Sequence, residues 1–65
     1  MTIETELEDE RWLAEVLELL GVMCYGATEA EAISRTEALA LRVIADKIDH
    51  GEEVPVLKQL FVTPA

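Results

Sequence analysis

The stretch that decides the fold is TEAEAISRTEALALRVIADKIDHG, residues 28–51. Thr28 followed three positions later by Glu31 is the pattern of a capping box, in which the Thr28 hydroxyl accepts from the Glu31 amide and the Glu31 carboxylate reaches back to the Thr28 amide. Apolar side chains then recur at helical spacing as far as His50, and Gly51 is a typical left-handed helix terminator. The sequence therefore predicts one long helix between Thr28 and Gly51.

One broad side of this helix is predicted to face a core. At about 100° per residue, most of its larger apolar side chains gather on that side, and charged side chains gather on the other. The predicted core side consists of Ala32, Ile33, Thr36, Leu39, Ala40, Leu41, Val43 and Ile44. The predicted solvent side consists of Glu31, Arg35, Arg42, Asp46 and Asp49.

The chain before the helix has the pattern of three short strands. Residues 2–8 alternate strictly between two kinds of side chain, residues 11–17 have one fully apolar face, and residues 22–25 are apolar. The polar run at residues 8–11 suits a hairpin turn, whose type stays open because the run contains neither Gly nor Asn.

A further strand is expected after Pro55, at residues 56–62, where both faces are mostly apolar. Such a strand either packs within its own chain or pairs with another chain. We favour a homo-oligomer. In a chain of 65 residues without a disulfide, the free energy gained by burying apolar surface barely exceeds the entropic cost of ordering the chain. Residues 1–65 are thus expected to form one α+β domain of order β-β-β-α-β, an antiparallel sheet packed on one long helix. The expected oligomer interface is Leu57, Leu60 and Phe61.

The composition argues against a membrane-spanning, secreted or disulfide-stabilised protein. The chain is 51% hydrophobic and carries 14 acidic residues against 5 Lys and Arg, a net charge of −9. Charges interrupt every apolar run, the N-terminus does not have the pattern of a secretory signal, and the single Cys24 excludes an internal disulfide. We expect a cytoplasmic protein that by itself binds neither nucleic acid nor membrane. The charge favours a basic protein partner, and plain solubility is the alternative explanation.

Four glutamates are the candidate partner-binding residues, because they could share the solvent face of the first hairpin: Glu4, Glu6, Glu8 and Glu15. They could form a docking surface for basic side chains, a carboxylate metal site, or a solvated strand face that discourages aggregation. The metal site is disfavoured, since glutamates at period two stand about 7 Å apart and no Asp or His joins them.

Catalysis is not expected. Cys24 lies in an apolar strand, where cysteine usually behaves as a small core residue, and His50 lies at a helix end, where it usually serves the helix dipole. The sequence contains no nucleophile elbow, zinc-protease motif or phosphate loop. We therefore expect no enzymatic activity, no metal and no cofactor.

The run WLAEVLELLGVMCYGATEAEA, residues 12–32, resembles the HicB-like antitoxin family. That family's pattern is an aromatic, Ala, a Val-Pro-Glu-Leu-Pro-Gly segment, a short strand, Gly, a Thr cap and Glu-Ala, and residues 51–55 resemble the Gly-Glu-x-Val-Pro segment that follows. The chain departs from the pattern at Leu17 and Leu20, where the family usually has Pro, and at Glu10-Arg11, which replaces an Asp-Gly turn. The matching positions are Trp12, Ala14, Val16, Glu18, Leu19, Gly21, Gly26, Thr28, Glu31, Ala32, Gly51 and Pro55.

The resemblance implies a reduced ribonuclease-H-like fold and an antitoxin function. Members of the family neutralise a small basic ribonuclease, a HicA-like toxin, and longer members add a C-terminal DNA-binding domain. This chain ends at Ala65, so promoter binding by it alone is not expected. The expected function is to bind and occlude a basic ribonuclease toxin. The alternative is a stand-alone homo-oligomeric domain that has no toxin partner.

Overall fold

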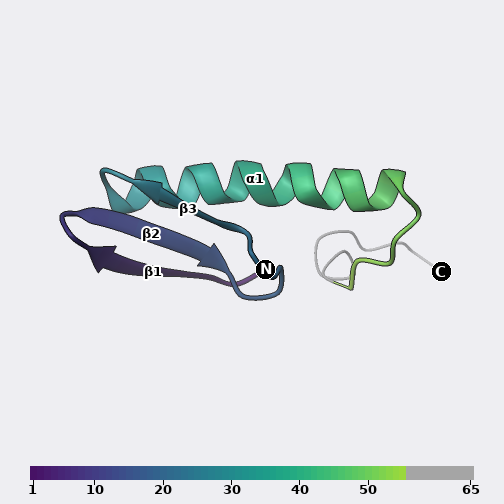
Figure 1. The fold of residues 1–65 in the computed structure, drawn as a ribbon, viewed down its shortest axis with the longest axis horizontal. Helices are drawn as coiled ribbons and strands as arrows, with labels where there is room; N and C mark the ends of the chain where they lie inside the picture. The colour runs from purple at the N-terminus through teal and green to yellow at the C-terminus, as the bar shows by residue number, and fades with distance from the viewer. Residues whose placement is uncertain (56–65) are drawn as a thin grey trace.

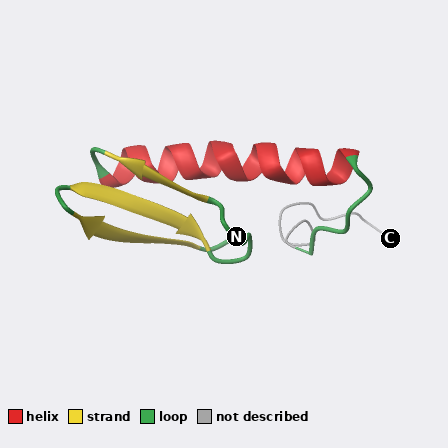
Figure 2. Cartoon of the chain, in the orientation of Figure 1, coloured by secondary structure: helices red, strands yellow, loops and turns green. Residues whose placement is uncertain are grey.

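A computed structural model describes residues 1–55 and shows a three-stranded antiparallel sheet packed against one long helix (Figure 1, Figure 2). The strands β1 (Ile3–Glu8), β2 (Arg11–Val16) and β3 (Met23–Gly26) lie side by side in that order, and α1 (Glu29–Asp49) covers one face of the sheet. The expected β-β-β-α part of an α+β domain is confirmed. The expected last strand, with Leu57, Leu60 and Phe61, lies outside the described residues.

The β1–β2 hairpin closes in a two-residue turn. Glu8 is the register partner of Arg11, so Asp9 and Glu10 alone form the loop. Their φ angles are +46° and +66°. Two successive positive φ values are typical of a type I′ turn, whose twist matches that of the flanking strands. This turn usually recruits Asn-Gly, which is why its type could not be predicted from these two residues.

The N-terminus of α1 is capped by Thr28, as the sequence predicts. The Thr28 Oγ1 accepts a hydrogen bond of 3.1 Å from the Glu31 amide. The second half of the expected capping box is wrong by one residue, because the Glu31 Oε1 accepts from the amide of Ala27 at 3.2 Å. The same oxygen lies 3.3 Å from the Arg35 guanidinium, so the carboxylate is held between these two donors.

The C-terminal end of α1 is followed by Gly51 as the terminator, again as predicted. Gly51 has a φ of +73°, a conformation that costs glycine little. Its amide donates to the carbonyl of Ile48 at 3.0 Å, and the Glu52 amide donates to that of Lys47 at 2.9 Å. These two bonds form a Schellman motif, which satisfies carbonyl groups that have no partner inside the helix.

Small side chains let α1 approach the sheet closely. Gly26 is buried in β3, and a Cβ atom built on it would lie 2.5 Å from the backbone nitrogen of Ala32. Thr36 is fully buried, and its Oγ1 donates to the carbonyl of Ala14 in β2 at 3.1 Å. The helix and the sheet therefore contact each other through backbone atoms and short side chains.

The sheet lies under the N-terminal half of α1 (Figure 1), and the main cluster of buried apolar side chains lies under its C-terminal half. Ala40 and Ile44 bury themselves there against a cluster that comes from the end of β2, the loop after it and the segment after the helix. That cluster consists of Val16, Leu19, Val22 and Val54.

The predicted core side of the helix is wrong at Leu41. It is 57% exposed, whereas the sequence places it on that side. The buried positions of α1 form a single row at intervals of four residues, namely Ala32, Thr36, Ala40 and Ile44. Leu41 follows Ala40 by about 100° around the helix, which takes it beyond the narrow strip of the helix that is buried.

Candidate partner-binding surface

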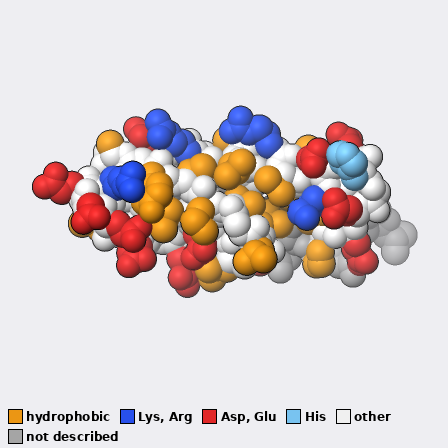
Figure 3. Space-filling view, viewed as in Figure 1, with side chains coloured by type: hydrophobic (Ala, Val, Ile, Leu, Met, Phe, Trp, Pro, Cys, Tyr) orange, Lys and Arg blue, Asp and Glu red, His pale blue; other side chains and the backbone are white. Residues whose placement is uncertain are grey.

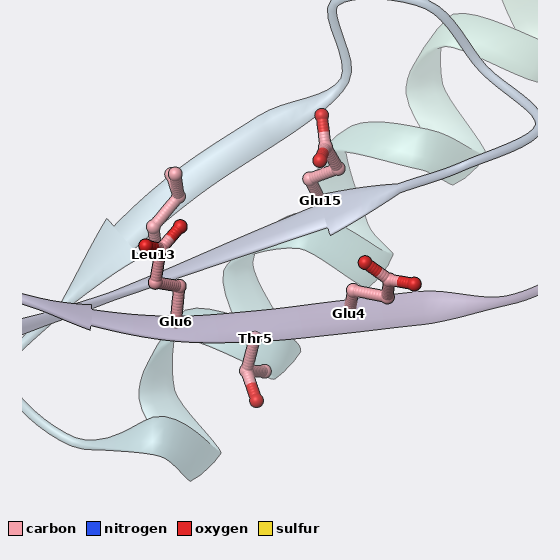
Figure 4. A pocket seen from close by; sticks show the side chains of 5 residues that line it. All are labelled: Glu4, Thr5, Glu6, Leu13 and Glu15. Carbon is pink, nitrogen blue, oxygen red and sulfur yellow. The ribbon is translucent and has the colours of Figure 1, made fainter.

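The sheet face that points away from α1 is the candidate binding surface, and we call it the outer sheet face. Strand alternation and register place eight side chains on it. Thr5 points the other way, and its hydroxyl donates to the Glu29 carboxylate of α1 at 2.8 Å (Figure 4). The outer sheet face consists of Glu4, Glu6, Glu8, Arg11, Leu13, Glu15, Met23 and Tyr25.

Three of the four predicted glutamates form a cluster on this face. Glu4, Glu6 and Glu15 stand with Leu13 around an open hollow of about 180 Å³ (Figure 4). Glu4 is the direct register partner of Glu15, and like charges directly opposite each other destabilise a strand pair. None of the three carboxylates forms a hydrogen bond or ion pair with any residue that the structure describes. The cluster is therefore available to cations from another molecule.

Glu8, the fourth predicted glutamate, is placed differently. The Tyr25 hydroxyl donates to the Glu8 Oε2 at 3.2 Å. The Arg11 guanidinium carbon lies 3.9 Å from the centre of the Tyr25 ring, the geometry of a cation–π contact. Glu8 is thus tied into a contact across all three strands, and its position indicates a structural role beside the cluster.

The part of the outer sheet face toward β3 is largely apolar, and sequence reasoning missed the contribution of Met23 and Tyr25 to it. Met23 and Tyr25 are 42% and 39% exposed, and Leu13 is half-buried between them and the glutamates. The sequence predicts an apolar strand around Tyr25 without indicating which way its side chains point. The signal available was the strand's own alternation, since Met23 and Tyr25 must point away from the side that Cys24 occupies.

Cys24 and His50, the two side chains considered for catalysis, do not come together as a nucleophile–base pair. Cys24 lies in β3, under the N-terminal half of α1, whereas His50 is the C-terminal cap of that helix (Figure 1). The His50 Nδ1 lies 2.7 Å from the carbonyl oxygen of Asp46. Within residues 1–55, no group of three or more His, Cys, Asp or Glu side chains is arranged to hold a metal ion. The chemistry that the outer sheet face offers is recognition by charge and apolar contact.

Comparison of the chain with protein-family models, with curated proteins and with solved structures finds no match. The search of the described residues for a helix long and apolar enough to cross a bilayer also finds none. The outer sheet face and the residues that carry the resemblance are thus the basis on which a function can be proposed.

Proposed function

We propose that this protein is an antitoxin-type inhibitor that binds a small basic ribonuclease and occludes its RNA-binding surface. The observation that carries the proposal is the cluster of Glu4, Glu6 and Glu15, three carboxylates held on one sheet face without a cation from the described residues. The resemblance of residues 12–32 to HicB-like antitoxins supports the same class of partner.

The proposed mechanism is competition with RNA for the same basic side chains. A protein surface that binds RNA carries Lys and Arg that contact phosphates. Carboxylates accept charge-assisted hydrogen bonds from the same side chains, and Arg can bind them in a bidentate manner. Glu4, Glu6 and Glu15 would thus take the place of successive phosphates, and the sheet behind them would exclude the RNA.

The two halves of the outer sheet face would contribute to different rate constants. The net charge of −9 attracts a basic partner over long range and raises the association rate. Leu13, Met23 and Tyr25 offer apolar area beside the glutamates, and such desolvated contacts mainly slow dissociation.

The proposal predicts that a neighbouring reading frame encodes a small basic protein. The test is coexpression of the two proteins, scored by growth rescue and by copurification. We expect the wild-type chain to rescue growth and to copurify with that protein. The variant Glu4→Gln, Glu6→Gln, Glu15→Gln keeps side-chain shape, and we expect it to bind at least about 10-fold more slowly.

A matched control removes the same number of charges far from the sheet. It combines Asp49→Asn, Glu52→Gln and Glu53→Gln, all exposed residues at or beyond the C-terminal end of α1. The ion pair of Glu52 with Lys47, 3.8 Å long and exposed, contributes little to stability. The control shares the lower net charge of the cluster variant, so we expect a modest loss of association rate, much smaller than that of the cluster variant, and we expect it to rescue growth.

Equal binding by the two triple variants would contradict a docking role for the cluster. A chain that self-associates but captures no basic protein and rescues no growth would support the alternative, a homo-oligomeric domain without a toxin.

A further inference from the structure

A second surface lies on the side of α1 that faces away from the sheet. Leu41 and Ile48 are 57% and 49% exposed there. Three small residues, all exposed, lie in line with them. We call this row the outer helix stripe, and it consists of Ser34, Ala38, Leu41, Ala45 and Ile48.

The spacing of the stripe is that of a helix–helix seam. Its five positions follow one another at intervals of four, three, four and three residues. This alternation gives the mean period of 3.5 that defines the contact positions of a coiled coil. The sheet is bound through another row, which includes Thr36 and Ala40, so the seam is not used within the described part of the chain. The Ala and Ser positions would let a second helix approach closely.

The charges beside the stripe indicate what packs on it. Glu37 lies on one side and Arg42 on the other, at the flanking positions that heptads use for interhelical ion pairs. Both are exposed, and neither forms an ion pair with a residue that the structure describes. In a parallel pair of these helices, Glu37 of each copy would face Arg42 of the other. Two-fold symmetry forms this contact twice.

The opposite helix direction fits less well. In an antiparallel pair, the residues that flank the stripe on one side face the residues on the same side of the stripe in the other helix. This arrangement would bring Arg42 against Arg42 of the second copy. Like charges in that position repel. The charge pattern therefore favours the parallel arrangement.

The overall charge distribution points to the same surface. Two chains with a net charge of −9 repel each other, and they repel least where basic side chains are concentrated. Three of the four Lys and Arg residues within residues 1–55 lie on α1, and two of them, Arg35 and Arg42, flank the stripe. Figure 3 shows basic side chains along α1 and acidic ones over the hairpin of β1 and β2.

We propose that the outer helix stripe is the interface of a parallel, two-fold homodimer of this chain. The occupant is a second copy, because the seam spacing, the small residues and the reciprocal pair of Glu37 with Arg42 all match the same surface on another molecule. The dimer does not depend on the toxin hypothesis, since the outer sheet face lies on the other layer and stays free.

The first test measures the oligomeric state of the full chain by sedimentation equilibrium over a range of concentrations. We expect a dimer for the wild type and at least about a 10-fold higher dimer dissociation constant for Leu41→Gln with Ile48→Gln. The control is Leu17→Gln with Leu20→Gln, which removes two leucines that are 49% and 104% exposed outside the stripe. It should leave the dissociation constant unchanged, and circular dichroism would confirm that both variants fold.

The second test exchanges the flanking charges. Glu37→Arg and Arg42→Glu should each weaken the dimer, and the double variant should restore it, because the pair is re-formed with reversed sign. Glu37→Arg is informative because it lowers the net negative charge and should still weaken association. A monomeric wild type, or a dimer unaffected by the stripe variant, would overturn the proposed interface. A double variant no stronger than the single ones would overturn the parallel arrangement.

Discussion

Gly26 is the residue at which the two layers touch through their backbones. A side chain there would place its Cβ 2.5 Å from the Ala32 nitrogen, which is fixed in the first turn of α1. We expect Gly26→Ala to lower the free energy of unfolding by roughly 1–3 kcal/mol, the usual cost of overpacking. Urea denaturation would measure this loss. A midpoint equal to that of the wild type would show that β3 and α1 can separate without cost.

Glu18 lies in the loop after β2 and links this loop to the N-terminus. The Thr2 amide donates to both of its carboxylate oxygens, at 2.7 and 3.0 Å, and these hydrogen bonds lower the pKa of Glu18 below its ordinary value. A carboxyl group with a lowered pKa in the folded state stabilises the fold above its unfolded pKa. This contribution is lost as the pH falls through the folded value.

The lowered pKa of Glu18 predicts how the stability of the variant Glu18→Gln depends on pH. We expect the variant to be less stable than the wild type near neutral pH, because an amide accepts hydrogen bonds more weakly than a carboxylate. The difference should shrink as the pH falls into the range where Glu18 is protonated in both states. Chemical denaturation at a series of pH values would measure it, and a difference that stays constant with pH would contradict the assigned cause.

Among the elements, the β1–β2 hairpin has backbone strain in its turn that substitution of the two turn residues should relieve. Asp9 and Glu10 occupy left-handed conformations that cost most residues about 1–2 kcal/mol and cost Asn and Gly less. We expect Asp9→Asn with Glu10→Gly to raise the free energy of unfolding by about 1 kcal/mol. Thermal or urea unfolding would measure the gain. A loss of stability would mean that the loop does not hold a type I′ turn.

The elements could be predicted from the sequence because their signals are local. Alternation located β1 and β2, and a short apolar run located β3, each within one or two residues. Thr28 and Gly51 marked both ends of the helix. The exposure of Leu41 and the true partner of the Glu31 carboxylate depend on neighbours in space, so the helical pattern alone did not give them.

The candidate surface was predictable to a similar extent. Period two placed Glu4 and Glu6 on one face, and the register with β2 brought Glu15 beside them. The apolar half with Tyr25 needed the direction of β3, which a four-residue strand specifies weakly. That these residues bind a partner remains a prediction.

At the scale of the whole molecule, the charge asymmetry predicts a salt-dependent encounter. Screening lengths fall from about 10 Å at 0.1 M salt to about 3 Å at 1 M. We expect the association rate with a basic partner to fall at least about 10-fold over that range, while the dissociation rate changes much less. Surface plasmon resonance would measure both rates. A salt effect confined to dissociation would contradict long-range attraction.

The sheet lies under only one half of α1, so the two halves of the helix are expected to differ in their stability against local unfolding. The N-terminal half rests on hydrogen-bonded strands, whereas the C-terminal half rests largely on Leu19, Val22 and Val54, which lie in segments outside the strands. Segments held by fewer ordered contacts open more often than the core. Amide protons in the last two turns of α1 should therefore exchange with deuterium before those of its middle, so the helix would melt from its C-terminal end.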